Sequence, residues 1–421
     1  MRERLYLCID LKSFYASVEC VERGLDPLTA LLAVADPERS DRTICLAVSP
    51  AMKKLGVANR CRVFQIPPGV NYIMAPPRMK LYIEYSAKIY GIYLKYAAKE
   101  DIHVYSVDEV FLDITDYLAL YRMDAEALAR KLMDDIREST GITAAAGIGS
   151  NLYLAKIALD ITAKHSPDHM GVLDEEGYRR TLWQHRPLSD FWRIGSRTEK
   201  KLNSMGIFTM EDLTRANEDM LYSVFGIDAE LLIDHAWGRE SVTMADIKNY
   251  MPKSTSVSSG QVLPRNYSYR EAELILKEMT DSLCLELLDR GLSTDSLTLV
   301  IGYAAEYEKP PSCGTAALPT QTNSYRQMIS HVLCCYQKIT DHGVPIRRIN
   351  ISCNRAVNQL YQQYDLFHSP QELERERRLQ QAVLTVKKRF GGNALLRGMD
   401  LLKAGTAIER NRQIGGHKSG E

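Results

Sequence analysis

Residues 103–114 read HVYSVDEVFLDI, and this stretch decides the fold. Two apolar runs, residues 103–107 and 110–114, are separated only by the acidic residues Asp108 and Glu109. Apolar and aromatic runs of this length, bounded by polar residues, are typical of strands. The stretch therefore predicts a hairpin of two strands with both acids at its tip.

The hairpin fits into a larger alternation of strands and helices. Residues 5–9 form another apolar run that ends at Asp10, and residues 14–19 after it have helical spacing. A further strand is expected at residues 143–148, before a helix through residues 154–158. This order predicts an α+β fold, an open sheet with helices packed on one face.

The rest of the chain divides into four segments. Residues 28–70 favour short strands and one helix, followed by a helix with aromatic spacing at residues 82–93. Residues 173–245 are mostly helical and include two short helices around a glycine turn. Residues 252–260 are expected to be a tether before a second α+β unit. Beyond residue 358 the charged, weakly apolar sequence predicts partial disorder.

Composition narrows the class of protein. The 421 residues are 45% hydrophobic, so the chain can bury a sizeable core. Lys+Arg and Asp+Glu both number 53, so any positive surface for nucleic acid must be local. The nine cysteines lack the spacing of a zinc site, and no apolar run is long enough to span a bilayer. A cytoplasmic protein with reduced thiols is expected, neither exported nor embedded in a membrane.

Three acids stand where strands end, at Asp10, Asp108 and Glu109. Phosphoryl transfer by two metal ions needs oxygen ligands that converge from separate strands, and magnesium prefers carboxylates to imidazole or thiolate. Each acid taken alone is as easily an ordinary turn residue. Together they predict a site for two Mg²⁺ ions.

Two long motifs carry a resemblance to a known family. Residues 9–19 read IDLKSFYASVE and residues 106–113 read SVDEVFLD, and both resemble the metal-binding motifs of Y-family DNA polymerases. The resemblance continues through residues 147–158 and covers residues 5–355. It implies an α+β right-hand polymerase that copies damaged DNA with low fidelity, depends on magnesium and has no proofreading exonuclease.

The resemblance also implies domain boundaries. The palm would comprise residues 1–25 and 72–172, the fingers 26–71, the helical thumb 173–245, the little finger 253–356, and a tail 357–421. Residues 49–53 and 259–264 resemble most the UmuC branch, the catalytic type of bacterial polymerase V. Pro50 and Lys53 stand where many members have Tyr and Arg. This branch implies two partners, a RecA filament and a UmuD-type subunit.

Position by position, the motifs assign roles. Asp10, Asp108 and Glu109 match the family's metal ligands, and the carbonyl of Leu11 matches a main-chain ligand. Tyr15 matches the steric gate, an aromatic ring that leaves no room for a ribonucleotide 2′-hydroxyl.

The incoming deoxynucleoside triphosphate needs cations and N–H donors. Lys53 in the fingers, Lys164 after the helix, and the N–H groups of Phe14 and Tyr15 could supply them. Lys164 lies one residue further from Ala155 and Lys156 than in many relatives, and Lys156 could instead support the site.

Primer-template DNA and a clamp are the expected macromolecular partners. Lys200 and Lys201 in the helical hairpin, with Arg347 and Arg348 in the second unit, are candidates for phosphate contacts. The pentapeptide QYDLF resembles a bacterial sliding-clamp-binding motif, in which Gln363, Leu366 and Phe367 would make the contacts. Alternatively, Leu366 and Phe367 pack back on the little finger.

Two other classes of protein share some of these features. Another two-metal enzyme on a similar fold, such as a nucleotidyl cyclase or a nuclease, would also pair acids, but the Phe14-Tyr15 pattern speaks against it. A DNA-binding accessory protein without catalysis would gain nothing from clustered acids that face a phosphate.

Overall fold

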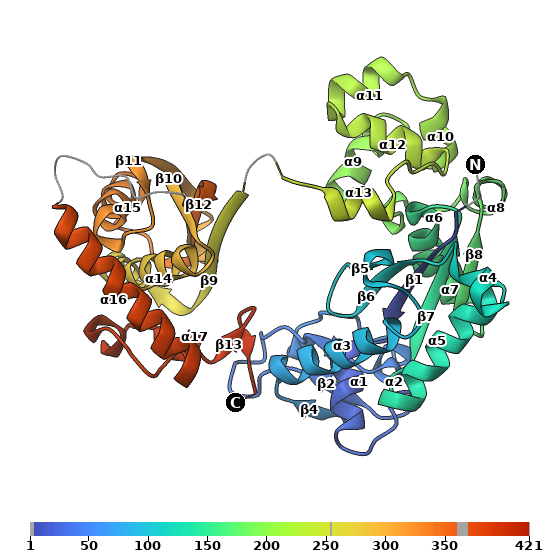
Figure 1. The fold of residues 1–421 in the computed structure, drawn as a ribbon, viewed down its shortest axis with the longest axis horizontal. Helices are drawn as coiled ribbons and strands as arrows, with labels where there is room; N and C mark the ends of the chain where they lie inside the picture. Colours follow the sequence, from blue (N-terminus) through green and yellow to red (C-terminus); the bar gives the residue numbers. More distant parts are fainter. Residues whose placement is uncertain (1–3, 253–254, 360–368, 421) are drawn as a thin grey trace. The chain divides into compact units, whose positions relative to one another are not determined.

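The computed structural model describes residues 4–252, 255–359 and 369–420. The chain divides into two compact units, residues 1–250 and residues 251–419. Each unit combines helices with a sheet (Figure 1), which confirms the expected α+β fold. No helix in the described ranges is long and apolar enough to cross a membrane.

The sheet of the first unit has five strands. In spatial order its strands are β5 (Ile102–Val104), β6 (Glu109–Asp113), β1 (Tyr6–Leu11), β7 (Ala144–Gly149) and β8 (Met170–Leu173). Strand β1 is antiparallel to both β6 and β7, and β7 is parallel to β8. The apolar runs at residues 5–9, 110–114 and 143–148 thus form neighbouring strands, as expected, whereas only the first two residues of the run 103–107 belong to a strand, β5.

Helices cover both faces of this sheet, so the expectation of one covered face was wrong. The helices concerned are α1 (Phe14–Val21), α3 (Met79–Tyr93), α4 (Tyr117–Tyr121), α5 (Ala125–Thr140), α6 (Leu152–Ile157) and α7 (Ala163–His165). Leu7 and Ile9 pack with α1, α3 and α5, whereas Tyr6 and Cys8 pack with α6 on the other side. Strand β1 is apolar on both faces, and each face must be kept from water.

A small sheet beside α1 has a core of its own. It consists of β3 (Ala47–Val48), β2 (Leu32–Val34) and β4 (Ile73–Ala75), with α2 (Pro50–Lys54) alongside. Ser49 caps α2 by accepting a hydrogen bond from the N–H of Met52, and Pro50 occupies the first helical position. The short strands and single helix expected at residues 28–70 are confirmed.

Helices dominate residues 174–250, which we call the helical region. They are α8 (Glu175–Leu182), α9 (Ser196–Ser204), α10 (Met210–Arg215), α11 (Glu218–Phe225), α12 (Asp228–Ala236) and α13 (Met244–Asn249). Gly206 joins α9 to α10 at a φ of 80°, which a glycine adopts without strain. The expected pair of short helices around a glycine turn is therefore present.

The second unit is a sheet covered by two long helices. Its strands, in spatial order, are β11 (Ser312–Thr322), β10 (Leu292–Tyr303), β12 (Ile346–Asn358) and β9 (Thr255–Tyr267), and the helices are α14 (Tyr269–Asp289) and α15 (Tyr325–Ile339). The tether expected at residues 252–260 was partly wrong, because residues 255–260 pair with β12 as part of β9, in agreement with the strand that residues 256–263 also predict. Strand β11 was not predicted.

The charged sequence after residue 368 is folded, contrary to the expectation of partial disorder. It forms α16 (Pro370–Phe390), α17 (Ala407–Arg410) and the hairpin of β13 (Gln413–Ile414) and β14 (His417–Lys418). Glu278 of α14, only 5% exposed, accepts hydrogen bonds from the backbone and hydroxyl of Thr406 at 3.0 and 3.1 Å. Specific polar contacts thus fix a segment whose composition alone suggested disorder.

Candidate active site

The three acids converge at one end of the central strands. Asp10, near the end of β1, lies directly opposite Glu109, the first residue of β6. The N–H of Leu11 donates to the carbonyl of Asp108 at 2.9 Å, so the backbone holds Asp108 beside the same strand end. The expected convergence of Asp10, Asp108 and Glu109 is therefore present in the backbone.

Glu109 lies in a strand rather than at the tip of the hairpin, so this part of the prediction was wrong. The turn comprises residues 105–108, and the N–H groups of Tyr105 and Ser106 both donate to the carbonyl of Glu109, at 3.0 and 3.1 Å. Asp108 belongs to the turn and Glu109 to β6. The two adjacent acids reach one site because the chain bends between them.

Burial and mutual repulsion dominate the electrostatics. Burial, then the charges of Asp108 and Glu109, raise the pKa of Asp10 to about 7. Burial also raises the pKa of Glu109, and Lys156 opposes this shift. Burial and the neighbouring acids together thus disfavour the charged form of Asp10.

Lys156 of α6 is the main counterion of Glu109. Its ammonium lies 2.9 Å from a carboxylate oxygen of Glu109 and 2.9 Å from one of Asp160, and Lys156 is 8% exposed. The thiol of Cys8 donates to Glu109 at 3.3 Å. The suggestion that Lys156 supports the site agrees with these contacts.

The carboxylates of Asp10, Asp108 and Glu109 are suitable ligands for a hard divalent cation, although the three side chains do not point to one place. Within the described ranges, no three His, Cys, Asp or Glu side chains are close enough to hold a metal ion. Glu109 is turned to Lys156, and Asp108 accepts a hydrogen bond from Ser106 at 2.6 Å. Carboxylate oxygens that repel one another in a partly buried site are the ligands that magnesium prefers. A cation would draw Asp108 and Glu109 toward Asp10.

Tyr15 lies beside the acids on a rigid support. Its ring stacks on Tyr82 with centroids 4.6 Å apart and 21° between the planes. The buried Tyr82 donates its hydroxyl to Glu19 at 2.8 Å, and Arg78 donates two hydrogen bonds to Glu19 at 2.9 and 2.8 Å. Burial raises the pKa of Tyr15, and the charge of Asp108 adds to the shift.

The sequence did not single out the support of Tyr15. The regular spacing of tyrosines between residues 82 and 93 was visible, but it could not show that Tyr82 faces Tyr15. Phe14, the neighbour of Tyr15, is 2% exposed at the first position of α1, where backbone N–H groups have no partner within the helix.

Lysines surround the acids from several elements. Burial lowers the pKa of Lys53 of α2, the charge of Asp10 opposes this shift, and the charge of Lys164 of α7 adds to it. Partial burial, offset by Asp10, lowers the pKa of Lys12 to about 8. Lys12 was not among the expected residues, although it lies inside the motif that contains Asp10.

A π-helical turn sets the position of Lys164. Residues Ala158–Thr162 form this turn between α6 and α7. A π turn accommodates one extra residue within an α-helix. The turn lies between Lys156 and Lys164, the segment in which one residue more than in many relatives was expected.

The expected DNA-binding residues differ in their surroundings. Lys200 on α9 is exposed. Lys201 donates to the carbonyl of Val224 at 2.8 Å, so it also fastens α9 to α11. In the second unit, Arg348 is exposed on β12 and Arg347 is half-buried.

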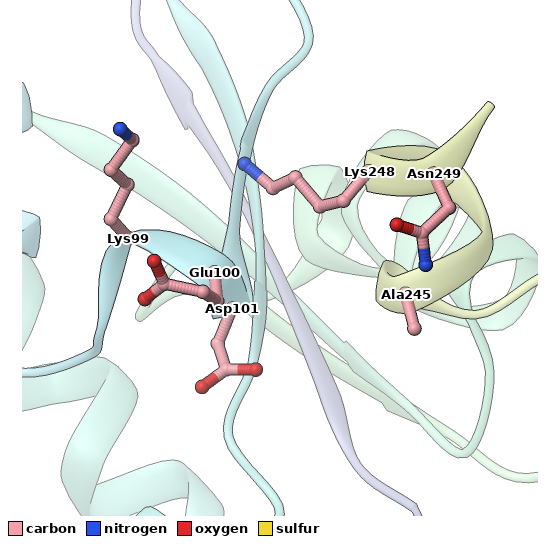
Figure 2. Close-up of a pocket in the computed structure, with 6 residues that line it drawn as sticks. All are labelled: Lys99, Glu100, Asp101, Ala245, Lys248 and Asn249. Carbon is pink, nitrogen blue, oxygen red and sulfur yellow. The ribbon is translucent and has the colours of Figure 1, made fainter. Parts of the chain in front are cut away.

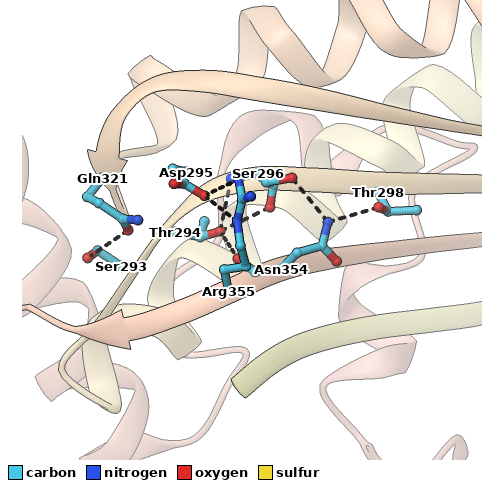
Figure 3. A network of polar contacts seen from close by, with 8 residues as sticks. All are labelled: Ser293, Thr294, Asp295, Ser296, Thr298, Gln321, Asn354 and Arg355. Carbon is cyan, nitrogen blue, oxygen red and sulfur yellow. Dashed lines mark hydrogen bonds and ion pairs between the residues drawn. The ribbon is translucent and has the colours of Figure 1, made fainter. Parts of the chain in front are cut away.

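Small polar side chains occupy one face of the second sheet. Thr298 of β10 pairs with Ser352 of β12, and Ser352 pairs with Ser258 of β9. Asn354 donates to Ser296 and Thr298 at 3.3 and 2.9 Å, as Figure 3 shows. Hydroxyl and amide groups of this kind are suited to phosphate contacts.

A hollow in the first unit has no link to the acids. It has a volume of about 330 Å³ and lies between α13 and the start of β5 (Figure 2). Lys248 donates to the carbonyl of Ile102 at 2.6 Å and so fastens α13 to this edge strand. The hollow is a packing feature.

The residues of the expected clamp motif, Gln363, Leu366 and Phe367, lie outside the described residues.

Comparisons with known proteins agree with the fold and the motifs. Residues 9–160 match the model of the impB/mucB/samB family, and residues 254–366 match the model of its C-terminal domain. The chain is 32% identical to a UV-damage repair protein, UvrX, of Bacillus subtilis, over 98% of this chain and 97% of that protein. It is 30% identical to DNA polymerase IV 2 of the same organism, over 99% of both.

A solved structure shares the fold. A Y-family DNA polymerase chimera of Dbh and Dpo4 is 21% identical and superimposes with a TM-score of 0.67, covering 84% of this chain and 99% of the chimera. The family models, the two relatives and this fold agree. The chain belongs to the impB/mucB/samB family, the Y family of translesion DNA polymerases.

Proposed function

We propose that this chain is a template-directed DNA polymerase that performs error-prone translesion synthesis with two Mg²⁺ ions. Members of its family use divalent metal ions. The observation that carries the proposal is that the backbone brings Asp10, Asp108 and Glu109 to one strand end, where the charge of Asp108 also acts on Tyr15. These acids, with the carbonyl of Leu11, would hold the ions.

Bound magnesium would activate the primer hydroxyl and stabilise the charge that develops on the phosphates. The residues of the chain bind and orient the substrate. The N–H groups of Phe14 and Tyr15 at the start of α1 are suited to phosphate oxygens, and Lys53 and Lys164 would supply positive charge on the side of Asp10.

Tyr15 would exclude ribonucleotides by its shape. Its ring has no freedom to retreat, because it stacks on Tyr82, which is buried and hydrogen-bonded to Glu19. A substrate sugar with a 2′-hydroxyl would meet the ring, whereas a deoxyribose would not.

DNA would be held through its phosphates by the second unit and the helical region. Residues 251–421 contain 22 Lys and Arg against 17 Asp and Glu, whereas residues 1–250 contain 31 against 36. The net charge of zero thus conceals a positive second unit. Arg347, Arg348 and the polar face of its sheet would contact DNA there, and Lys200 and Lys201 would do so in the helical region.

Partners beyond the substrates are also part of the proposal. The pentapeptide with Gln363, Leu366 and Phe367 would bind a sliding clamp, and this tether would compensate for a weak grip on DNA. The resemblance to the UmuC branch supports a RecA filament and a UmuD-type subunit as further partners. The enzyme would act in the cytoplasm, where bacterial DNA lies.

Primer extension tests the proposal. The chain should extend a primer on an undamaged template and past a template lesion when Mg²⁺ and deoxynucleotides are present, and it should release no nucleotides from a primer end. Failure to extend either template would refute a polymerase function.

A paired substitution tests the clamp motif. Replacing Leu366 and Phe367 with Ala should abolish stimulation by a loaded clamp and leave synthesis without clamp unchanged. The matched control replaces Leu379 and Phe390 of α16, which are 64% and 66% exposed. Equal stimulation of both variants would refute the clamp role, and loss of both activities in the first variant would favour the packing alternative.

A further inference from the structure

One indole hydrogen bond joins the helical region to the turn that carries Asp108. The ring N–H of Trp192, in the loop before α9, donates to the hydroxyl of Tyr105 at 3.1 Å. Tyr105 begins the turn, and its own N–H donates to the carbonyl of Glu109 at 3.0 Å. Residues 87 positions apart in the sequence are thereby connected next to two of the three acids.

Ring contacts reinforce this connection on the side of the sheet. The centroids of Tyr105 and Phe111 lie 5.9 Å from that of Trp192. Tyr105 and Phe111 are 5.7 Å apart in an edge-to-face arrangement. The three rings thus form one packed group, and aromatic pairs of this geometry hold a preferred orientation.

The helical region fixes Trp192 from its other side. The ring of His235 in α12 lies 6.3 Å from Trp192, with 16° between the planes, and stacks on Tyr153 of α6 at 3.9 Å. His235 is 3% exposed and pairs with Glu240 at 3.1 Å. The guanidinium of Arg193 lies 4.9 Å from the centre of the Trp192 ring.

The hydrogen bond is not needed to satisfy a buried group. Tyr105 is 46% exposed, so water could replace its partner with little loss of stability. Its loss would therefore affect geometry more than folding. Trp192 and Tyr105 are suited to holding the turn of Asp108 in one orientation.

We propose that Trp192 is a positioning residue for the metal-binding acids: through Tyr105 it orients the turn of Asp108 relative to the helical region. This inference rests on the proposed polymerase function. The inference predicts that loss of the Trp192–Tyr105 hydrogen bond lowers the rate of nucleotide addition and raises the Mg²⁺ concentration that the reaction needs. The affinity for DNA should not change.

Single-turnover insertion of one nucleotide tests the inference with the variants Tyr105→Phe, Trp192→Phe and the double variant. Each single variant should lower the maximal rate about threefold to tenfold, the range expected of one neutral hydrogen bond. Each should also raise the Mg²⁺ concentration for half-maximal rate. The double variant should be no slower than the slower single variant, because both substitutions remove the same bond.

Trp183→Phe is the matched control. Trp183 also lies in the helical region and donates its ring N–H, at 2.9 Å, to the carbonyl of Ala236, away from the acids. This variant should keep the wild-type rate and magnesium requirement. Circular dichroism and DNA binding should be unchanged in all variants.

Three results would overturn the inference. They are an unchanged rate and magnesium requirement in Tyr105→Phe, losses that multiply in the double variant, and an equal loss in Trp183→Phe. If the wild-type chain itself adds no nucleotide, the proposed function fails. If the wild type is active and the variants keep its rate and magnesium requirement, the positioning role is refuted but the proposed polymerase function is not.

Discussion

Replacing Lys156 with Met would break the charge network behind Glu109. The ammonium of Lys156 lies 2.9 Å from both Glu109 and Asp160, and the side chains of Lys156, Glu109 and Asp160 are 9%, 10% and 30% exposed. Removing one partner of a buried ion pair typically costs about 3–5 kcal/mol, because the remaining charge stays buried. Asp160 retains contact with water, so we expect a loss of about 3 kcal/mol in the free energy of unfolding.

The loss should depend on pH with a definite sign. Burial already raises the pKa of Glu109, and removal of Lys156 would raise it further. A carboxyl whose pKa is raised by folding destabilises the fold in its charged form. The loss in the free energy of unfolding of Lys156→Met should therefore be largest at a pH above the raised pKa of Glu109. It should shrink as the pH falls toward the ordinary pKa of a glutamate, about 4.3.

Denaturant unfolding followed by tryptophan fluorescence measures this loss in the first unit, because all three tryptophans, Trp183, Trp192 and Trp237, lie there. The control is Lys95→Met, which removes an ion pair at 3.3 Å from a lysine side chain that is 58% exposed. We expect a loss of at most about 0.5 kcal/mol from the control. Equal losses in the two variants would refute the view that Lys156 offsets the burial of Glu109.

Three further predictions concern the metal, the sugar and the packing of α6. Because the pKa of Asp10 is raised to about 7, a cation that binds below pH 7 must displace a proton. The Mg²⁺ concentration for half-maximal primer extension should therefore rise by up to about tenfold for each pH unit below 7, and it should be constant above pH 7. Tyr15→Ala should increase ribonucleotide incorporation relative to deoxynucleotides by about tenfold or more, whereas Tyr15→Phe should not; kinetics of single insertions measure both. A Cβ at Gly149 would lie 2.1 Å from the backbone N of Ala155, so Gly149→Ala should lower the free energy of unfolding by at least about 3 kcal/mol. The control is Gly91→Ala, in open space on α3, which should not destabilise the fold; thermal melts measure both variants.

The sequence was sufficient for the core of the site because its signals are local. Apolar runs at residues 5–9 and 110–114 predicted the strands that bring Asp10 opposite Glu109. The acids themselves lie at the ends of these runs. Antiparallel pairing of β1 with β6, which are far apart in the sequence, then places Asp10 and Glu109 together.

Other elements carry no such signal. Strand β11 contains small polar residues and Pro319, which resemble a loop, yet it pairs because it lies at the edge of the sheet, where proline is tolerated. Helix α16 has few apolar residues, and it packs against α14 through a narrow face that includes Leu373 and Gln380. Composition predicted both segments poorly.

Contacts between distant residues were also beyond the sequence. Nothing in the order of residues shows that Tyr82 stacks under Tyr15 or that Trp192 reaches Tyr105. These pairs depend on how α3 and the helical region pack against the sheet. Only the folded chain reveals them.

The central claim is that Asp10, Asp108 and Glu109 hold the metals for nucleotide transfer, and Asp108→Ala tests it most directly. Asp108 is partly exposed in a turn, so its loss should leave thermal stability and primer-template affinity nearly unchanged. The rate of single-nucleotide insertion with Mg²⁺ should fall by more than about 1,000-fold, while Glu100→Ala, an exposed acid of the same unit, should retain the wild-type rate. Substantial insertion by Asp108→Ala would contradict the assignment.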